Sequence, residues 1–272
     1  MTASIDDVLA GRARWALVHG DCAEVLAVLP AKSVDHVITD PPYSEAVHSK
    51  SRSGRGLPDS DAFACRARRK VEFGFDHLTP ELRGAVSKHA GRIARRWSLV
   101  FSDVESTHLW RDDLVAAGTE YVRTGIWIKE GCTPQFTGDR PAVAFEAVTI
   151  VHPKGRKRWN GGGKRGVWSV PIELDRGGHQ RVDRIHSTQK PLELMMQLVA
   201  DFTDPDDVIV DAFAGSFATG LACMRLGRRV IGIEADPANY AAALARMEAE
   251  DNGQTLHAVR NGQVPLFGKG AA

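Results

Sequence analysis

Short apolar segments rich in valine and isoleucine alternate along this chain with longer segments of helical periodicity. The segments that predict strands are residues 16–18, 34–39, 98–102, 121–129, 143–151, 208–210 and 230–233. Those that predict helices are residues 23–29, 81–97, 106–117, 192–202, 217–226 and 238–250. Such alternation favours an α/β domain with a mainly parallel sheet. No helix separates 121–129 from 143–151, so we expect an antiparallel hairpin at one edge of a seven-stranded sheet.

Two basic segments interrupt this alternation. Residues 46–71 hold seven lysines and arginines against two aspartates, a net charge of +5. Residues 153–185 hold nine against three acidic residues, a net charge of +6, together with three consecutive glycines. Long loops within a compact domain are often functional. We therefore single out residues 44–75 and 153–185 as candidate binding regions, whereas residues 251–272 are expected to form a weakly structured tail.

The bulk composition is that of an ordinary globular protein. The chain has 272 residues, of which 43% are hydrophobic and 25% charged, and its formal net charge is +1. Any surface that binds nucleic acid must therefore be local. The four cysteines are far apart and the histidines are scattered, so we expect neither a disulfide framework nor a metal site. The first 15 residues lack the apolar core of a signal peptide, and no membrane-spanning segment is expected. These features favour a cytoplasmic protein.

The tetrapeptide Asp40-Pro41-Pro42-Tyr43 directly follows the predicted strand 34–39. In open α/β sheets, ligands bind at the carboxyl ends of the strands. Consecutive prolines hold the backbone extended, so the Asp40 carboxylate and the Pro41 carbonyl become two fixed acceptors, which suit an –NH2 group with its two donors. Tyr43 offers an aromatic face for stacking. The competing interpretation is a proline turn that ends the strand and has no chemistry.

A second motif lies at the end of the predicted strand 208–210. Asp211-Ala212-Phe213-Ala214-Gly215-Ser216 reads as a strand-to-helix turn whose glycine lets a ligand approach backbone N–H groups. It lacks a full G-x-G-x-x-G, which argues against a dinucleotide. Glu234 ends the next predicted strand, where a carboxylate can accept hydrogen bonds from ribose hydroxyls. An ordinary tight turn without a ligand is the alternative.

The two motifs resemble the catalytic and cofactor motifs of amino-group DNA methyltransferases, and their order resembles the permuted β class, over about residues 14–250. The resemblance implies a Rossmann-like methyltransferase domain that uses S-adenosyl-L-methionine. It further implies cofactor contacts from Asp21 and Cys22, and from the segment His186-Ser187-Thr188-Gln189-Lys190-Pro191. The cofactor residues expected by resemblance are Asp21, Cys22, Ser187, Thr188, Lys190, Asp211, Phe213, Gly215, Ser216, Glu234 and Asp236.

The chain departs from the usual family pattern D-P-F-x-G-S-G-T at three positions. Ala212 replaces proline, Phe217 replaces the second glycine and Ala218 replaces threonine. Phe217 is a bulky residue at the start of the predicted helix 217–226. At the sequence level we therefore expect its ring beside the cofactor pocket, where it would affect cofactor affinity.

By this resemblance, the expected reaction is methyl transfer to N6 of a flipped-out adenine in double-stranded DNA, without a metal. Asp40 and Pro41 would grip the amine, and Pro42 and Tyr43 would complete the catalytic motif. Aspartate in this tetrapeptide accompanies N6-adenine enzymes, whereas serine accompanies N4-cytosine enzymes. N4-cytosine methylation and a non-catalytic DNA-binding protein remain alternatives. Residue type and motif order argue against a protein or RNA amine methyltransferase.

The expected DNA contacts follow from the basic loops. Residues 153–185 would form the target-recognition region, and residues 44–75 would close over DNA or cofactor. Candidate phosphate contacts are Arg156, Lys157, Arg158, Lys164, Arg165 and Arg181. The resemblance also implies a homodimer encoded by a bacterium or a phage.

Overall fold

The computed structural model describes residues 3–42, 78–132, 134–135, 138–173, 189–255 and 259. Within them, eight strands form one sheet in the order β1-β8-β7-β2-β3-β5-β4-β6. The strands are β1 (Trp15–His19), β2 (His36–Thr39), β3 (Ser98–Ser102), β4 (Thr119–Glu130), β5 (Phe145–Pro153), β6 (Val167–Pro171), β7 (Val208–Asp211) and β8 (Arg229–Glu234). Only β5 runs antiparallel to its described neighbours, so the mixed, mainly parallel sheet expected from the sequence is confirmed.

The predicted hairpin is present, but it does not form the edge of the sheet. Strands β4 and β5 pair antiparallel, and β6 adds to the outer side of β4 in parallel. The sequence prediction missed β6 because its apolar pattern is short and lies within a basic, glycine-rich segment. Trp168 and Val170 of β6 are buried, whereas the residues alternating with them are exposed. Gly125 of β4 makes room for the Trp168 ring, which a Cβ at that position would approach to 2.6 Å.

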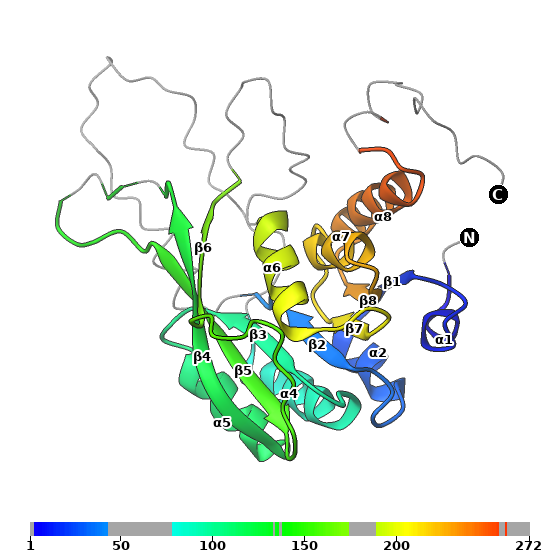
Figure 1. Cartoon of the computed structure of the whole chain (residues 1–272), viewed down its shortest axis with the longest axis horizontal. Coiled ribbons are helices and arrows are strands. Elements are labelled where there is room, and N and C mark those ends of the chain that lie inside the picture. Colours follow the sequence, from blue (N-terminus) through cyan, green and yellow to red (C-terminus); the bar gives the residue numbers. More distant parts are fainter. Residues whose placement is uncertain are drawn as a thin grey trace.

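Helices cover both faces of the sheet (Figure 1). One face carries α6 (Leu192–Phe202), α7 (Ala218–Arg225) and α8 (Pro237–Asp251). The other carries α2 (Cys22–Val28), α4 (Pro80–Ile93) and α5 (Thr107–Ala116), with the short α1 (Ile5–Leu9) at its margin. No helix among these described segments is long and apolar enough to cross a membrane.

Two of the differences from the predicted helices have local reasons. Helix α1 was not predicted because it is only five residues long, although Ser4 and Asp7 form a capping box at its start. Helix α4 ends four residues earlier than expected. There the backbone leaves the helix and Ala94 forms a bridge with Val34, next to β2.

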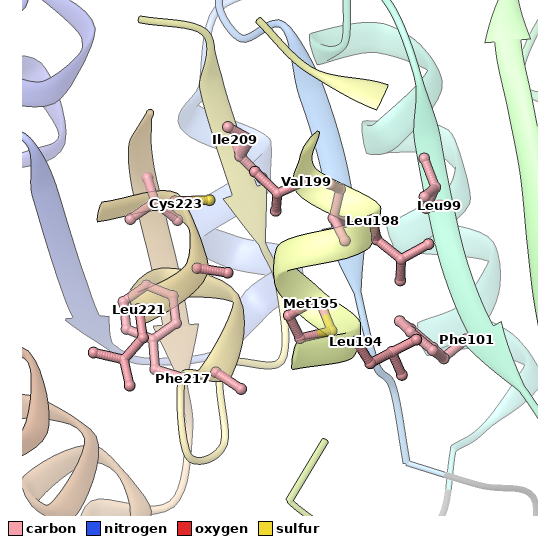
Figure 2. Packing of buried hydrophobic residues seen from close by; sticks show 14 of the residues in the cluster. Leu99, Phe101, Leu194, Met195, Leu198, Val199, Ile209, Phe217, Leu221 and Cys223 are labelled. Atoms are coloured by element: carbon pink, nitrogen blue, oxygen red, sulfur yellow. The ribbon is translucent and has the colours of Figure 1, made fainter. Parts of the chain in front are cut away.

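The apolar core on the α6–α7–α8 face contains Phe217 (Figure 2). Its side chain is fully buried, and its backbone adopts the left-handed conformation, with φ +55°. The ring lies against Gly220 of α7 and Gly232 of β8, where an added Cβ would come within 2.7 and 2.4 Å of it. These two glycines therefore create the space that the ring fills between α7 and the sheet.

Candidate active site

Asp40 lies at the carboxyl end of β2, in the middle of the sheet. Its Oδ2 atom accepts a hydrogen bond from Lys190 Nζ at 2.5 Å, across 150 positions of sequence. Pro41, which follows it, is buried, and Pro42 is half-buried. Lys190 directly precedes α6 and is 7% exposed. The strand-end position expected for the catalytic motif is thus present, together with a buried ion pair that the sequence did not predict.

The ion pair continues into a chain of four alternating charges. Lys190 Nζ also contacts Glu146 Oε2 of β5 at 3.0 Å, and Glu146 Oε1 contacts Lys129 Nζ of β4 at 2.5 Å. Burial would lower the pKa of Lys190, but Asp40 and Glu146 together raise it to about 12. Lys190 therefore remains an ammonium group within the protein.

The second oxygen of Asp40 is available for another donor. The Oδ1 atom is buried and accepts no hydrogen bond from any residue that the structure describes. Burial raises the pKa of Asp40, the positive charge of Lys190 lowers it, and Glu146 raises it again. Buried acceptors are rarely left without a donor, and those that are require an explanation. An –NH2 group of a substrate is a donor that would satisfy Oδ1.

The turn after β7 lies next to Asp40 and is organised by Asp211. Thr39 Oγ1, one residue before Asp40, donates to Asp211 Oδ1 at 2.8 Å and accepts from the Ala212 N–H at 3.1 Å. The Phe213 N–H also donates to Asp211 Oδ1, at 3.2 Å. Burial raises the pKa of Asp211 to about 7. Asp211 is only 2% exposed, so in this structure it holds the turn together through buried hydrogen bonds.

Gly215 and Glu234 form the part of the turn that is suited to a ligand. Gly215 has φ +52°, and a Cβ at that position would meet nothing within 4 Å. Its N–H donates to Glu234 Oε2 at 2.7 Å, and the Asp236 N–H donates to Glu234 Oε1 at 2.9 Å. Asp236 in turn caps α8 by accepting from the Asn239 N–H. A fixed carboxylate beside an open glycine turn fits the ribose of a nucleoside cofactor.

The remaining candidate cofactor residues surround this turn. Asp21 caps α2 by accepting from the N–H groups of Ala23 and Glu24, and Cys22 is buried behind it. Ser216 is buried, and its carbonyl accepts a hydrogen bond from the buried Arg246 of α8 at 2.8 Å. Phe213 is half-buried against the core on the α2–α4–α5 face. Arg246 was not predicted, because an arginine within a helical pattern is usually a solvated surface residue.

One expectation about this turn needs correction. The ring of Phe217 does not lie beside a cofactor pocket, because it is buried in the core between Gly220 and Gly232. The left-handed backbone at Phe217 turns its side chain under α7 rather than toward the open side of Gly215. Glycine would adopt the same positive φ without steric penalty, so the bulk of Phe217 adds to the core.

The structure does not bring the described basic residues of 153–185 to this site. Strand β5 runs from Glu146 at the site to Pro153 at the opposite ends of the strands. At about 3.3 Å per residue, the two residues lie about 23 Å apart. There the Trp97 Nε1–H donates to the Arg158 carbonyl. Three cations of this segment form ion pairs: Lys157 with Glu120, Arg158 with Asp204, and Lys164 with Asp201. Arg156 and Arg165 are exposed beside them.

Several predicted residues lie outside the described part of the chain. They are Tyr43, Arg181, Ser187 and Thr188. The loop predicted at 44–75 also lies wholly outside it, as do residues 174–185 of the recognition region and most of the tail 251–272. Their roles remain expectations from the sequence.

Sequence reasoning missed two charged residues of the site, Lys129 and Glu146. Each lies in a correctly predicted strand, but their pairing depends on β4 and β5 aligning beside β3. The available signal was the acidic residue itself, because Glu146 begins a mainly apolar run in which the next six residues are buried. A buried charge requires a partner.

Comparisons with known sequences relate the chain to DNA methylases. The profile of the N6/N4 methyltransferase family, described as DNA methylase, matches residues 116–245. The type II methyltransferase M.HinfI of Haemophilus influenzae is 25% identical over 247 residues. That match covers 80% of this chain and 64% of M.HinfI, so the chain spans less than two thirds of that relative's length. Over that part, the chain is therefore similar to the N6/N4 DNA methylases.

Two solved structures share the fold. The M1.HpyAVI–SAM complex aligns with a TM-score of 0.61 at 21% identity, covering 84% of this chain and 97% of that one. The PvuII DNA methyltransferase, described as cytosine-N4-specific, aligns with a TM-score of 0.66 at 16% identity, covering 92% and 91%. The chain therefore shares the Rossmann-like fold of these two structures.

Proposed function

We propose that this chain, as a relative of the N6/N4 DNA methylases, transfers a methyl group from S-adenosyl-L-methionine to N6 of an adenine in double-stranded DNA. The observation that carries the proposal is the buried, unpartnered Oδ1 of Asp40, next to the cofactor-type turn at Gly215 and Glu234. The hydrogen bonds of Thr39 link the two parts of the site. The proposed catalytic and cofactor groups thus come from the ends of the adjacent strands β2, β7 and β8.

The proposed cofactor residues are those around the turn, with Glu234 on the ribose hydroxyls and Gly215 giving backbone access. When bound, the cofactor supplies an electrophilic methyl group. The Asp40 Oδ1 atom and the Pro41 carbonyl accept the two N–H bonds of the target amine and raise the electron density on its nitrogen. The amine loses one proton as it gains the methyl group, and Asp40 Oδ1 is placed to receive it. Catalysis rests on positioning and electrostatics.

The target base lies inside the duplex before reaction, so the enzyme must flip it out, at a cost of a few kcal/mol. Tyr43 is proposed to stack on the flipped ring. Asp40 favours adenine over cytosine only by resemblance, and the matched family includes methylases of both amines. N4-cytosine methylation is therefore the second candidate, and the assay below separates the two.

The test is methylation of unmodified duplex DNA of mixed sequence by the purified protein with the cofactor. Nucleoside mass spectrometry is expected to show N6-methyladenine. N4-methylcytosine alone would overturn the base assignment, and the absence of both would overturn the methyltransferase proposal. Asp40→Asn keeps the size of the side chain but removes its charge, so it is expected to lower the rate by about a thousandfold, about 4 kcal/mol. Cofactor affinity, measured by calorimetry, is expected to stay nearly unchanged.

The proposed assembly is a homodimer, which would extend the DNA-binding surface beyond one chain. Light scattering of the purified protein tests this directly, and a monomer at assay concentrations would contradict it.

A further inference from the structure

The ammonium group of Lys190 is held from two sides. Its Nζ atom lies 2.5 Å from Asp40 Oδ2 and 3.0 Å from Glu146 Oε2. It also lies 5.1 Å from the centroid of the Phe101 ring and 5.9 Å from that of Trp127. The side chains of Lys190 and Glu146 are 8% and 9% exposed. This contact is therefore largely protected from water, where charged pairs are weakest.

The Glu146 carboxylate affects which oxygen of Asp40 the Lys190 ammonium group contacts. An ammonium group with one carboxylate partner is drawn toward both of its oxygens, because each carries part of the charge. That arrangement would cover Asp40 Oδ1. Glu146 approaches Nζ from β5, and Nζ contacts Oδ2 of Asp40, while Oδ1 has no donor among the described residues.

We propose that Glu146 is a positioning residue for methyl transfer, which holds Lys190 on Oδ2 of Asp40 and so keeps Oδ1 open for the substrate amine. The inference rests on the proposed function and deepens it. Glu146 acts through Lys190 and has no contact with the reacting atoms. Lys129, at 2.5 Å from Glu146, fixes the outer end of the same chain.

The charges around Asp40 predict in which direction its pKa changes when each neighbouring charge is removed. From the described elements, the groups facing Asp40 are Lys190 before α6, Glu146 on β5, Lys129 on β4 and Asp211 on β7. Glu146 raises the pKa of Asp40, and Lys129 lowers it. Neutralising Glu146 must therefore lower the pKa of Asp40, whereas neutralising Lys129 must raise it.

The experiment compares Glu146→Gln and Lys129→Gln in the full-length protein. Transfer of radiolabelled methyl groups to duplex DNA is measured across pH, with cofactor and DNA saturating. Glu146→Gln is expected to lower the plateau rate by about 10- to 100-fold, because Nζ shifts over Oδ1. The acid limb of the pH–rate profile reports ionisation of Asp40. For Glu146→Gln this limb is expected to move to lower pH, whereas for Lys129→Gln it is expected to move to higher pH. The matched control is Glu120→Gln, which breaks a Lys–Glu pair of 2.5 Å at the far end of β4 and is expected to change neither quantity.

A second measurement does not depend on turnover. Carbon-13 NMR of labelled aspartate carboxylates, with the Asp40 signal assigned by Asp40→Asn, follows the titration of Asp40 in each variant. The same opposite shifts are expected, and thermal unfolding verifies that each variant is folded.

The outcomes separate this inference from the proposed function. If the wild-type protein transfers methyl groups while Glu146→Gln keeps its rate and acid limb, Glu146 is not a positioning residue and the proposed function stands. If the wild-type protein transfers none, the proposed function fails. The NMR titration then still shows whether Glu146 changes the pKa of Asp40. Unchanged Asp40 titration in both variants overturns the inference.

Discussion

Phe217 is strained and buried at once, so its replacement by alanine and by glycine should have effects in an unusual order. Its backbone has φ +55°, and its ring is fully buried among Leu17, Gly220 and Gly232. Alanine removes the ring and keeps the left-handed strain. Glycine removes the ring and the strain together, because it adopts positive φ without a steric penalty.

The magnitudes decide the order. Removing a buried phenylalanine ring costs about 3–5 kcal/mol of unfolding free energy. A left-handed residue other than glycine carries about 1–2 kcal/mol of strain. Glycine regains that strain energy but loses about 0.4–1 kcal/mol through the freer unfolded chain. Phe217→Gly is therefore expected to be more stable than Phe217→Ala by up to about 1.6 kcal/mol, although it removes one more carbon atom.

The assay is guanidinium unfolding of each variant, followed by tryptophan fluorescence. Leu221 is the matched control, because it is buried in the same core but lies within the regular helix α7. At Leu221 the order should reverse, since glycine within a helix is about 1 kcal/mol worse than alanine. A Phe217→Gly protein less stable than Phe217→Ala would refute the assigned strain, and a loss below about 1 kcal/mol in both would refute the packing of the ring.

Three further predictions concern the site and its surroundings. Glu234→Ala is expected to weaken cofactor binding about tenfold or more through lost hydrogen bonds, and an unchanged calorimetric affinity would contradict the ribose assignment. The folded-state pKa of Asp211 is raised to about 7. The free energy of unfolding of the wild-type protein should therefore decrease as the pH rises from about 4 to about 7, by at most about 4 kcal/mol, because only the folded state retains the proton in that range. Unfolding of Asp211→Asn should lack this contribution, and identical pH profiles would argue against burial of the charge. Joint replacement of Arg156, Lys157 and Arg158 by alanine should leave the salt dependence of DNA affinity nearly unchanged, because they lie at the sheet edge opposite the site; a slope reduced by about 3 units would place phosphates there.

The sequence predicted best those features that depend on local patterns. The apolar run before Asp40 and the run before Asp211 are strands in the structure, and each motif lies at a strand end. The hairpin followed from the missing helix between its strands. Strand β6 was missed because only two of its residues are buried, which leaves too short a pattern to stand out from a loop.

The features that could not be predicted depend on which strands become neighbours. Glu146 meets Lys190 only because β5 is inserted between β3 and β4, against the direction of both. Charge counting assigned Lys157 to DNA, whereas the fold pairs it with Glu120. A sequence shows that a lysine is present, but not whether a carboxylate distant in the chain already neutralises it.

The strand order also governs when the protein can become active during its synthesis. Strand β1, near the start of the chain, pairs with β8, which ends at Glu234, and β2 pairs with β7. A ribosome therefore releases Asp40 about 170 residues before the strand that places Asp211 beside it, at roughly 5–20 residues per second. Until then, the apolar edges of β1 and β2 lack their partners, and such edges aggregate or recruit chaperones. A nascent chain that stops before β8 thus carries Asp40 without Glu234, so the candidate site is incomplete in it.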